Sequence, residues 1–367
     1  RNKTMQLDSK LHERIIDVYK FQDSLDLDEK GIEKVKSDAF KDCRNNKQIK
    51  SLRLYNSNSR ISFTKKHVSL FEPLKDHLVE LDLTYNAFEC SFNFIGDLIH
   101  LQKLILKGCI FRRSPVFKGA SNHLKHLDLK NCDLKINDEH MFSDLKCLTF
   151  LDLRNNEIQH HVLPNLFKEL KQLEILKLCM SDDAKEDIFI YLLNLRQLNL
   201  RELKIKRDCS TLFSPMKSLQ ILALKNSSLK GDALDSVTNL IELRLVNVSG
   251  LSIHKNFFDK HPNLQSLTIS PINKSYFTYN NFEGQMDQSV FTSLRSLKQL
   301  DLTGRQLEFF SKNMQENFRN LESLSLTNDD SSQTGGNRVN YINFKKKQFR
   351  FEKIKLNPSH LSSLRHL

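Results

Sequence analysis

Residues 148–158 read LTFLDLRNNEI, and this stretch decides the fold. Leu148, Leu151 and Leu153 stand at its first, fourth and sixth positions, and Asn156 stands at the ninth. Leu or Ile fills all three apolar positions in each of the stretches that start at Ile49, Leu78, Leu101, Leu124, Leu148, Leu173, Leu195, Leu219, Leu240, Leu264, Leu297 and Leu321. Since only 39% of the residues are apolar, chance does not explain the recurrence, and it indicates an internal repeat.

Each repeat predicts a short strand. Side chains at positions four and six point to one side of a strand, and those at positions three, five and seven point to the other. One such strand cannot bury its apolar side alone, so we expect repeats stacked about 4.8 Å apart in a parallel sheet. With a degenerate first repeat at Leu25 and Leu27, and a last one at Phe351, Ile354 and Leu356, about 13 repeats are predicted.

A phenylalanine recurs six residues before the start of many repeats, where we expect an aromatic spine on the convex side. It occupies this place at Phe142, Phe167, Phe189, Phe213, Phe258 and Phe291. With repeat intervals of mostly about 21 to 25 residues, the chain resembles the typical leucine-rich repeats of extracellular proteins, including Toll-like receptor ectodomains. The resemblance implies an α/β solenoid, a curved horseshoe with the parallel sheet on its concave face. Secreted members usually close both ends with clustered cysteines, and this sequence has no such cluster at either terminus.

The repeats also set the predicted domain boundaries. Residues 1–48 are interpreted as an N-terminal degenerate repeat or cap, and residues 49–367 as the array, with insertions near 273–285 and 329–350. Leu361, Leu364 and Leu367 look like the lead-in to another repeat. Because a solenoid without a polar cap exposes its core, we expect further chain or a partner to cover that end.

Composition and motifs argue against catalysis. The net charge of +12 favours acidic partners, and no apolar run approaches the roughly 18 residues of a membrane helix. The sequence lacks the G-x-S-x-G, H-E-x-x-H, G-x-x-x-x-G-K-[ST] and G-x-G-x-x-G motifs. His160-His161 and Asp138-Glu139-His140 have no partners at ligand spacing, so solvated side chains explain them better than metal ligands do. We predict a non-enzyme with no cofactor and no metal.

The seven cysteines are scattered and form no C-x-x-C, which indicates neither a zinc site nor a disulfide framework. Cys109 and Cys132 both stand at position nine, in adjacent repeats. Buried thiols are the favoured interpretation, and a bridge between the two repeats stays open. Cys179 at position seven is the best candidate for an exposed thiol.

Cations gather at the positions that face the concave side. Position seven holds Lys107, Lys130, Arg154, Arg201 and Lys225, and position five adds Lys177 and Arg244. Such a basic column could receive an acidic protein surface, a polyanionic glycan or nucleic-acid phosphates. Alternatively, Asp82, Asp128 and Asp152 at position five pair with Lys130 and Arg154 and cancel the field. Nucleic acid is the less favoured ligand, because only Tyr55, Tyr85 and Phe150 offer aromatic platforms there.

Two insertions and four sequons complete the candidate sites. Insertion-loop contacts are predicted at Tyr276, Phe277, Lys345, Lys346 and Lys347, with tolerated insertion as the alternative. The N-x-[ST] pattern marks glycosylation candidates at Asn2, Asn226, Asn247 and Asn273. Their number is about that expected by chance, so it does not indicate secretion. Glycans on Asn226 and Asn247 would obstruct the neighbouring part of the concave face.

The sequence therefore predicts a recognition module. The first hypothesis is an extracellular or cell-surface receptor-like ectodomain, of the kind used in innate immunity, which binds a protein or polyanionic ligand through the basic column and the insertions. The second is an intracellular adaptor, such as the substrate receptor of a ubiquitin ligase, which the unclustered cysteines favour. A homodimer or heterodimer is compatible with either hypothesis.

Overall fold

The computed structural model describes residues 5–7, 23–27, 32–41, 49–55, 60–67, 69–89, 93–117, 119, 123–180, 185–207, 209–251, 256–270, 288–303, 318, 320–327 and 340–343. The chain divides into two compact units. Unit 1 comprises Arg1–Cys179 and Ile190–Asn194, and unit 2 comprises Met180–Phe189 and Leu195–Leu367.

Unit 1 is built on a parallel sheet with one strand from each repeat. Its neighbouring strands are, in order, β2 (Ser24–Asp26), β4 (Ser51–Arg53), β6 (Glu80–Asp82), β8 (Lys103–Ile105), β10 (His126–Asp128), β12 (Phe150–Asp152) and β14 (Ile175–Cys179). The register aligns equivalent positions, since Leu127 pairs with both Leu104 and Leu151. Because β2 pairs with β4 in parallel, the degenerate repeat at Leu25 belongs to the same ladder.

Unit 2 follows the same plan. Its neighbouring strands are β15 (Gln197–Arg201), β16 (Ile221–Gly231), β17 (Glu242–Leu251), β18 (Ser266–Ser270), β19 (Gln299–Thr303), β20 (Ser323–Thr327) and β21 (Asn340–Asn343). All these pairs are parallel except β20 with β21, which is antiparallel. A strand that reverses direction is not a repeat strand, so part of the predicted 329–350 insertion folds back along the sheet.

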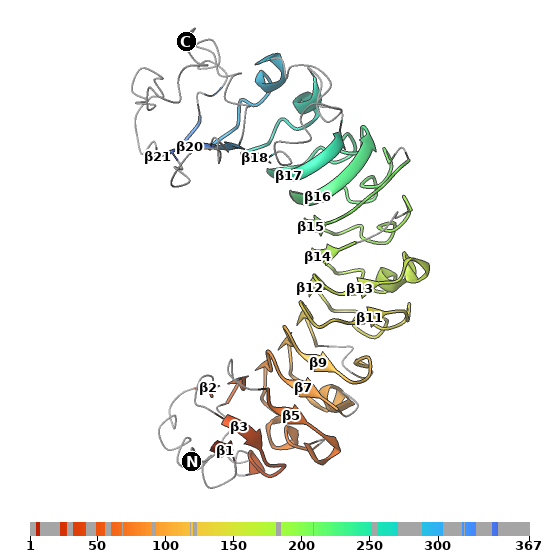
Figure 1. Ribbon diagram of the computed structural model, residues 1–367, viewed down its shortest axis with the longest axis vertical. Helices are drawn as coiled ribbons and strands as arrows, with labels where there is room; N and C mark the ends of the chain where they lie inside the picture. Colours follow the sequence, from red (N-terminus) through yellow and green to blue (C-terminus); the bar gives the residue numbers. More distant parts are fainter. Residues whose placement is uncertain are drawn as a thin grey trace, which may run out of the picture. The chain divides into compact units, whose positions relative to one another are not determined.

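The side opposite the main sheet is made of short elements, as Figure 1 shows for β5, β7 and β9. The strands there are β5 (Ser62–Phe63), β7 (Ala87–Phe88), β9 (Ile110–Phe111), β11 (Lys135–Ile136) and β13 (Glu157–Ile158), and β1 (Met5–Leu7) pairs with β3 (Ile32–Val35) separately. The 3-10 turns are η2 (Lys65–His67), η3 (Glu72–Leu74), η4 (Asn93–Asp97), η5 (His160–Val162), η6 (Asn165–Phe167), η7 (Phe257–Lys260) and η9 (Gln288–Phe291).

Among the described residues, these turns take the place of the α-helices that an α/β solenoid would carry. A repeat of about 24 residues spends most of its length on the strand and two crossings, which leaves a single tight turn rather than a helix. The parallel-strand leucine-rich-repeat solenoid itself is confirmed.

Leucines and phenylalanines form the core of each unit. Leu127, Leu151 and Leu222 are fully buried, as the repeat predicts. The six spine phenylalanines are also buried, and within unit 2 the Phe189 and Phe213 rings stack with centroids 6.3 Å apart. A second stack, which the sequence analysis did not identify, joins Phe63, Phe88 and Phe111 at centroid distances of 5.0 and 5.3 Å. It holds the short β5, β7 and β9 strands together.

The position-nine side chains fasten one repeat to the next. The Asn156 amide donates to the Leu129 carbonyl at 2.8 Å and to the Leu153 carbonyl at 3.0 Å, and its oxygen accepts the Leu134 N–H. Cys132 stands at the same position and its thiol donates to the Leu106 carbonyl at 3.0 Å. These bonds satisfy backbone groups that the turn would otherwise leave buried without partners.

Candidate ligand-binding face

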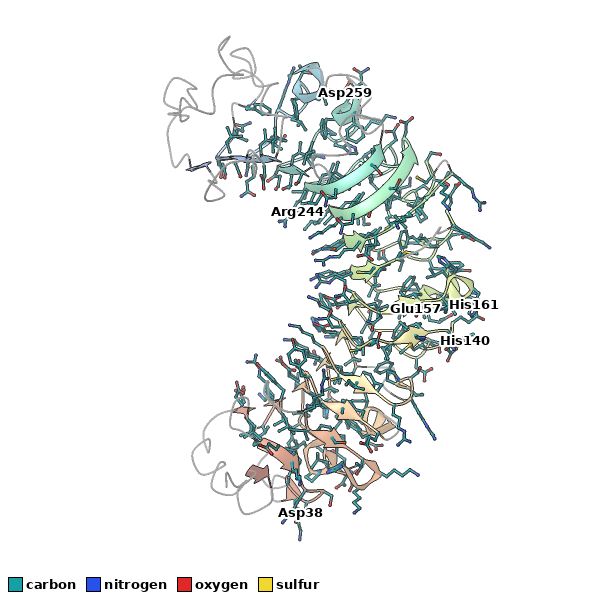
Figure 2. All side chains as sticks on the ribbon, in the orientation of Figure 1. Asp38, His140, Glu157, His161, Arg244 and Asp259 are labelled. Carbon is teal, nitrogen blue, oxygen red and sulfur yellow. The ribbon has the colours of Figure 1, made fainter. Side chains whose placement is uncertain are left out.

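The exposed side of each main sheet carries the predicted cations, and we call it the sheet face. In unit 1 it presents Lys107, Lys130, Arg154 and Lys177. Backbone hydrogen bonds from Gly108 N to Lys130 O (2.7 Å) and from Asn131 N to Arg154 O (2.9 Å) show that the three position-seven cations come from consecutive repeats. In unit 2, Arg201 pairs in register with Lys225, and Figure 2 shows Arg244 on the sheet side.

The position-five aspartates bind their own repeats rather than pairing across the sheet. Asp82, Asp128 and Asp152 each accept the backbone N–H of the residue two positions later, at 2.9 to 3.1 Å. Each carboxylate therefore caps the end of its strand. The expected cross-strand ion pairs with Lys130 and Arg154 are not formed among the described side chains.

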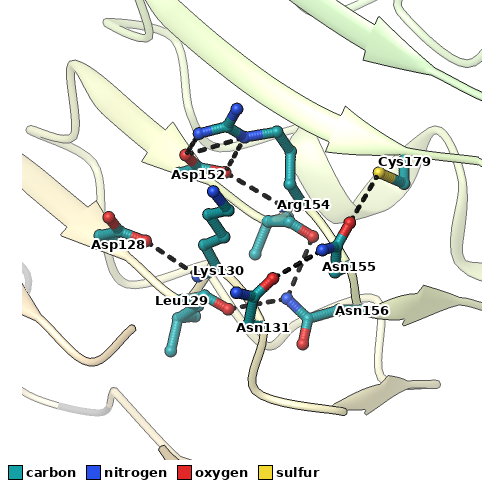
Figure 3. A network of polar contacts seen from close by, with 10 residues as sticks. Asp128, Leu129, Lys130, Asn131, Asp152, Arg154, Asn155, Asn156 and Cys179 are labelled. Carbon is teal, nitrogen blue, oxygen red and sulfur yellow. Dashed lines mark hydrogen bonds and ion pairs between the residues drawn. The ribbon is translucent and has the colours of Figure 1, made fainter. Parts of the chain in front are cut away.

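Arg154 differs from the other three predicted cations of unit 1 because its charge is paired. Its guanidinium donates hydrogen bonds to the Asp152 carboxylate within the same repeat (Figure 3). The Nη2–Oδ2 distance is 2.6 Å, and the Asp152 side chain is only 2% exposed. The hydrogen bond to Asp152 raises the pKa of Arg154. Burial raises the pKa of the adjacent Asp128 carboxyl, and the nearby Asp152 charge adds to the effect. Arg154 thus neutralises a buried carboxylate and contributes little to the field outside.

Lys107, Lys130 and Lys177 are half-buried on the sheet face and keep their charges unpaired among the described residues. Within the described ranges, none of the three has a carboxylate within ion-pair distance. The Lys107 ammonium lies 5.9 Å from the Tyr85 ring centroid, and the Lys177 ammonium lies 5.0 Å from that of Phe150. Cation–π contacts orient an ammonium group without cancelling its charge. We call these three residues the lysine triad.

A histidine that the sequence analysis missed lies at the centre of the same face. The His126 ring stacks on Phe150 with centroids 3.8 Å apart and an interplanar angle of 2°. Burial, reinforced by the Lys103 and Lys177 charges, lowers the pKa of His126 to about 4. The imidazole is therefore neutral near pH 7, and the lysines supply the local positive charge. The shared position three of His126 and Phe150 in adjacent repeats was the available signal.

The unit 2 cations have different surroundings. Arg244 forms an ion pair with Glu242, whereas Lys225 is exposed. Beside them, the sequon residues Asn226 and Asn247 adopt positive φ angles of 51° and 54°. The Asn247 amide donates to the Asn226 side-chain oxygen at 3.0 Å, so the two sequons lie next to one another.

Several predicted residues lie outside the described residues. These are the insertion-loop residues Tyr276, Phe277, Lys345, Lys346 and Lys347, and the sequon residues Asn2 and Asn273. On the side opposite the sheet face, Figure 2 shows His140, Glu157 and His161. Among the described residues, no group of three His, Cys, Asp or Glu side chains is placed to hold a metal ion. No helix in the described part of the chain is long and apolar enough to cross a membrane.

The cysteine thiols of unit 1 occupy two environments. Cys109 and Cys132 are buried and donate to backbone carbonyls, as the favoured interpretation predicted. Burial raises the pKa of Cys132 to about 12 and raises that of Cys109 well above its usual value. Cys179 is half-buried on the sheet face, and its thiol donates to Asn155 at 3.4 Å.

Comparison with known proteins supports the same fold. No family model matches the chain. The chain is 28% identical to human Toll-like receptor 3 over 298 residues, which cover 74% of the chain and 31% of that receptor. It therefore spans about a third of the length of the curated relative it matches.

Two solved structures carry the comparison further. A complex of TLR13 with ssRNA13 matches with a TM-score of 0.53 and 21% identity, over 80% of this chain and 50% of that one. An internalin from Listeria monocytogenes matches with a TM-score of 0.57 and 17% identity, over 89% and 96%. The chain thus has the leucine-rich-repeat fold and is similar to Toll-like receptor ectodomains.

Proposed function

We propose that this chain is the recognition module of a receptor-like protein and that unit 1 binds a partner with acidic groups through the lysine triad. The observation that carries the proposal is that Lys107, Lys130 and Lys177 lie half-buried on one sheet face without an ion-pair partner among the described residues, while the neighbouring aspartates are used as strand caps. A cationic face whose neighbouring carboxylates are bonded to their own repeats attracts and orients a negatively charged partner.

The partner class follows from the surface around the triad. The His126–Phe150 stack offers an apolar surface among the cations, which suits a protein with acidic and apolar side chains. Nucleic acid is the second ligand class, and it is favoured by the ssRNA13 bound to TLR13 in the similar structure. However, both faces of Phe150 are engaged, by His126 and by Lys177, so the ring is not a free stacking platform.

Charge reversal of the triad tests the proposal. In the Lys107→Glu/Lys130→Glu/Lys177→Glu variant, binding to poly-L-glutamate, measured by surface plasmon resonance at about 50 and 300 mM NaCl, should fall at least about tenfold and lose most of its salt dependence. The matched control is Lys135→Glu/Lys146→Glu/Lys168→Glu, which makes the same charge change at exposed unit 1 residues away from the sheet face. Equal losses in the two variants would show that net charge, rather than this face, governs binding.

Further contacts are proposed on the same grounds. Arg201, Lys225 and Arg244 would extend binding onto the sheet face of unit 2, with Lys225 the most available because Arg244 already pairs with Glu242. Tyr276, Phe277 and Lys345–Lys347 would contribute from the insertions. Further chain, a partner or a second copy would complete the assembly.

We infer an extracellular or cell-surface location and a role in innate immunity from the similarity to Toll-like receptor 3. The alternative, an intracellular adaptor for ubiquitination, is favoured by the buried, unbridged thiols of Cys109 and Cys132. Mass spectrometry of protein from its source separates the two locations. Glycans at Asn226 or Asn247 would support the receptor, whereas unmodified sequons together with reduced cysteines throughout would support the adaptor.

A further inference from the structure

Unit 2 has an open polar groove of about 540 Å³ at the edge where its main strands begin. One wall is formed by the residues that directly precede the strands, among them Arg196 before β15, Gln220 before β16 and Gln265 before β18. The lining also includes residues that precede the first leucine of a repeat, among them Asn239 and Asn263. The groove is separate from the lysine triad, which belongs to unit 1.

Backbone carbonyls directly before the strands are already used as acceptors. The Arg196 carbonyl accepts the N–H groups of Gln220 (2.9 Å) and Ile221 (3.0 Å). The Gln220 carbonyl accepts two N–H groups from the next repeat in the same way, at 2.8 and 3.0 Å. Because each of these two carbonyls already receives two hydrogen bonds, neither has a lone pair left for a ligand. Recognition in the groove must therefore use side chains.

Those side chains retain unused hydrogen-bonding capacity. Gln220, Asn263 and Gln265 make no side-chain hydrogen bond within the described parts of unit 2, and each amide can donate and accept. Asn239 is held in place because its amide donates to the Lys217 carbonyl at 2.8 Å. Neighbouring strands are separated by about 4.8 Å, which is close to the length of one sugar unit. Gln220 and Gln265 precede β16 and β18, so they lie two strand spacings apart, with Ile241 before β17 between them.

The charge and shape of the groove limit the class of ligand that it can bind. No carboxylate lines the groove, and its two cations, Arg196 and Lys217, both lie toward one end. Near the middle, the half-buried Ile241 gives an apolar surface of the kind that packs under the C–H face of a sugar ring. The lining has no deep apolar pocket for the side chains of a peptide, whereas the volume lies within the range of small-ligand sites.

We propose that this groove binds a short oligosaccharide, about three sugar units long, that carries a carboxylate on its terminal sugar. The amides hydrogen-bond the hydroxyl groups, and Arg196 and Lys217 hold the carboxylate. Sialyllactose is a suitable probe because it joins two neutral sugars to one acidic sugar, and lactose is its uncharged counterpart.

Titration of the full chain with each sugar, followed by saturation-transfer NMR, measures the affinity for sialyllactose and for lactose. Sialyllactose should bind at least about tenfold more tightly than lactose. Arg196→Gln/Lys217→Gln should remove that preference, and Gln220→Ala/Gln265→Ala should weaken both sugars about fivefold. The controls are Arg207→Gln and Gln197→Ala, which change the same residue types in unit 2 outside the groove lining.

The outcomes that overturn the proposal are specific. They are no saturation transfer from the protein to either sugar, equal affinity for both sugars, or unchanged binding in the two groove variants. Displacement of the sugar by a neutral polar heptapeptide at similar concentration would assign the groove to peptides instead. The lysine-triad reversal should leave sugar binding intact, so this proposal and the proposed function succeed or fail separately.

Discussion

His126 shows how one side chain on the sheet face makes stability depend on pH. Its pKa is lowered to about 4 in the folded chain, from 6.5 in the unfolded chain. Between these values the unfolded chain binds the extra proton, so the free energy of unfolding should fall as the pH falls from about 6.5 to about 4. The Phe150 stack is therefore weakest in acid.

Replacing His126 with Gln should flatten this pH dependence. Urea unfolding at about pH 7, 5.5 and 4.5 should show that the variant loses less stability than the wild type on acidification. The comparison uses the difference in pH dependence between the variant and the wild type. Asp128, whose pKa is raised in the folded chain, makes stability change with pH in the opposite direction, but it is present in both proteins and its contribution cancels. Parallel loss of stability in both proteins would contradict the assignment.

At the residue scale, the identity of the buried positions could be predicted, but the partners of the polar ones could not. Leu151 and Phe142 follow from spacing alone. The alternative interpretation had the position-five aspartates pairing with Lys130 and Arg154 across the sheet, yet Arg154 pairs with Asp152 of its own repeat, because a carboxylate two residues away reaches it without crossing the sheet. Asp128 caps its own strand for the same reason. The recurring Asp at position five was the available signal.

Gly108 illustrates a constraint at the scale of a single turn. It follows β8 with a φ of +68°, and a Cβ added there would lie 2.3 Å from Cδ1 of Tyr85. We expect Gly108→Ala to lower the free energy of unfolding by about 2 to 4 kcal/mol and to displace Tyr85 from Lys107. Thermal unfolding measures the first effect, and Tyr85 fluorescence reports the second.

The control for this substitution is Asn131→Ala. Asn131 stands at the same position one repeat later with a φ of 60°, so its replacement removes the left-handed preference without pressing on Tyr85. The loss should be about 1 kcal/mol. Similar losses at both sites would mean that backbone strain alone is responsible.

For the secondary-structure elements, the period of the repeat predicts the strands and their parallel order. It does not predict what fills the remaining residues of each repeat. The Phe63–Phe88–Phe111 stack escaped notice because these rings do not stand six residues before a repeat start. The reversal at β21 depends on an insertion whose sequence has no repeat character.

Across the whole molecule, hydrogen bonds between neighbouring repeats make the stability of each repeat depend on that of the next. Asn156 makes three hydrogen bonds in unit 1, to Leu129, Leu153 and Leu134. We expect Asn156→Ala to lower local stability by about 2 to 4 kcal/mol, because it leaves buried backbone groups without partners. Hydrogen exchange should accelerate in β10, β12 and β14 but not in β17 and β18 of unit 2.

The neighbouring Asn155→Ala serves as the control, since Asn155 is exposed and, among the described residues, its side chain bonds the Asn131 and Cys179 side chains but no backbone group. It should leave exchange in these strands nearly unchanged. A uniform acceleration across both units after Asn156→Ala would show that the chain unfolds as one cooperative body.

The fold could be predicted over most of the chain because thirteen-odd copies of one pattern reinforce each other. The binding face could be located only as a set of positions. Whether Lys107 or Arg154 is available to bind a ligand depends on which carboxylate lies nearest to it in space. The spacing of residues along the sequence does not contain that information. The unit 2 groove was not predicted, because its exposed amides have no distinctive motif.

The thiols of Cys109 and Cys132 also report whether unit 1 stays folded. Both thiols are sealed in adjacent repeats, and a proton on each is held far more firmly than in water. A thiol reagent can therefore reach and modify them only when unit 1 opens. Once modified, neither sulfur could donate its hydrogen bond to the backbone carbonyl again, so a single opening of unit 1 would leave the cysteines permanently modified.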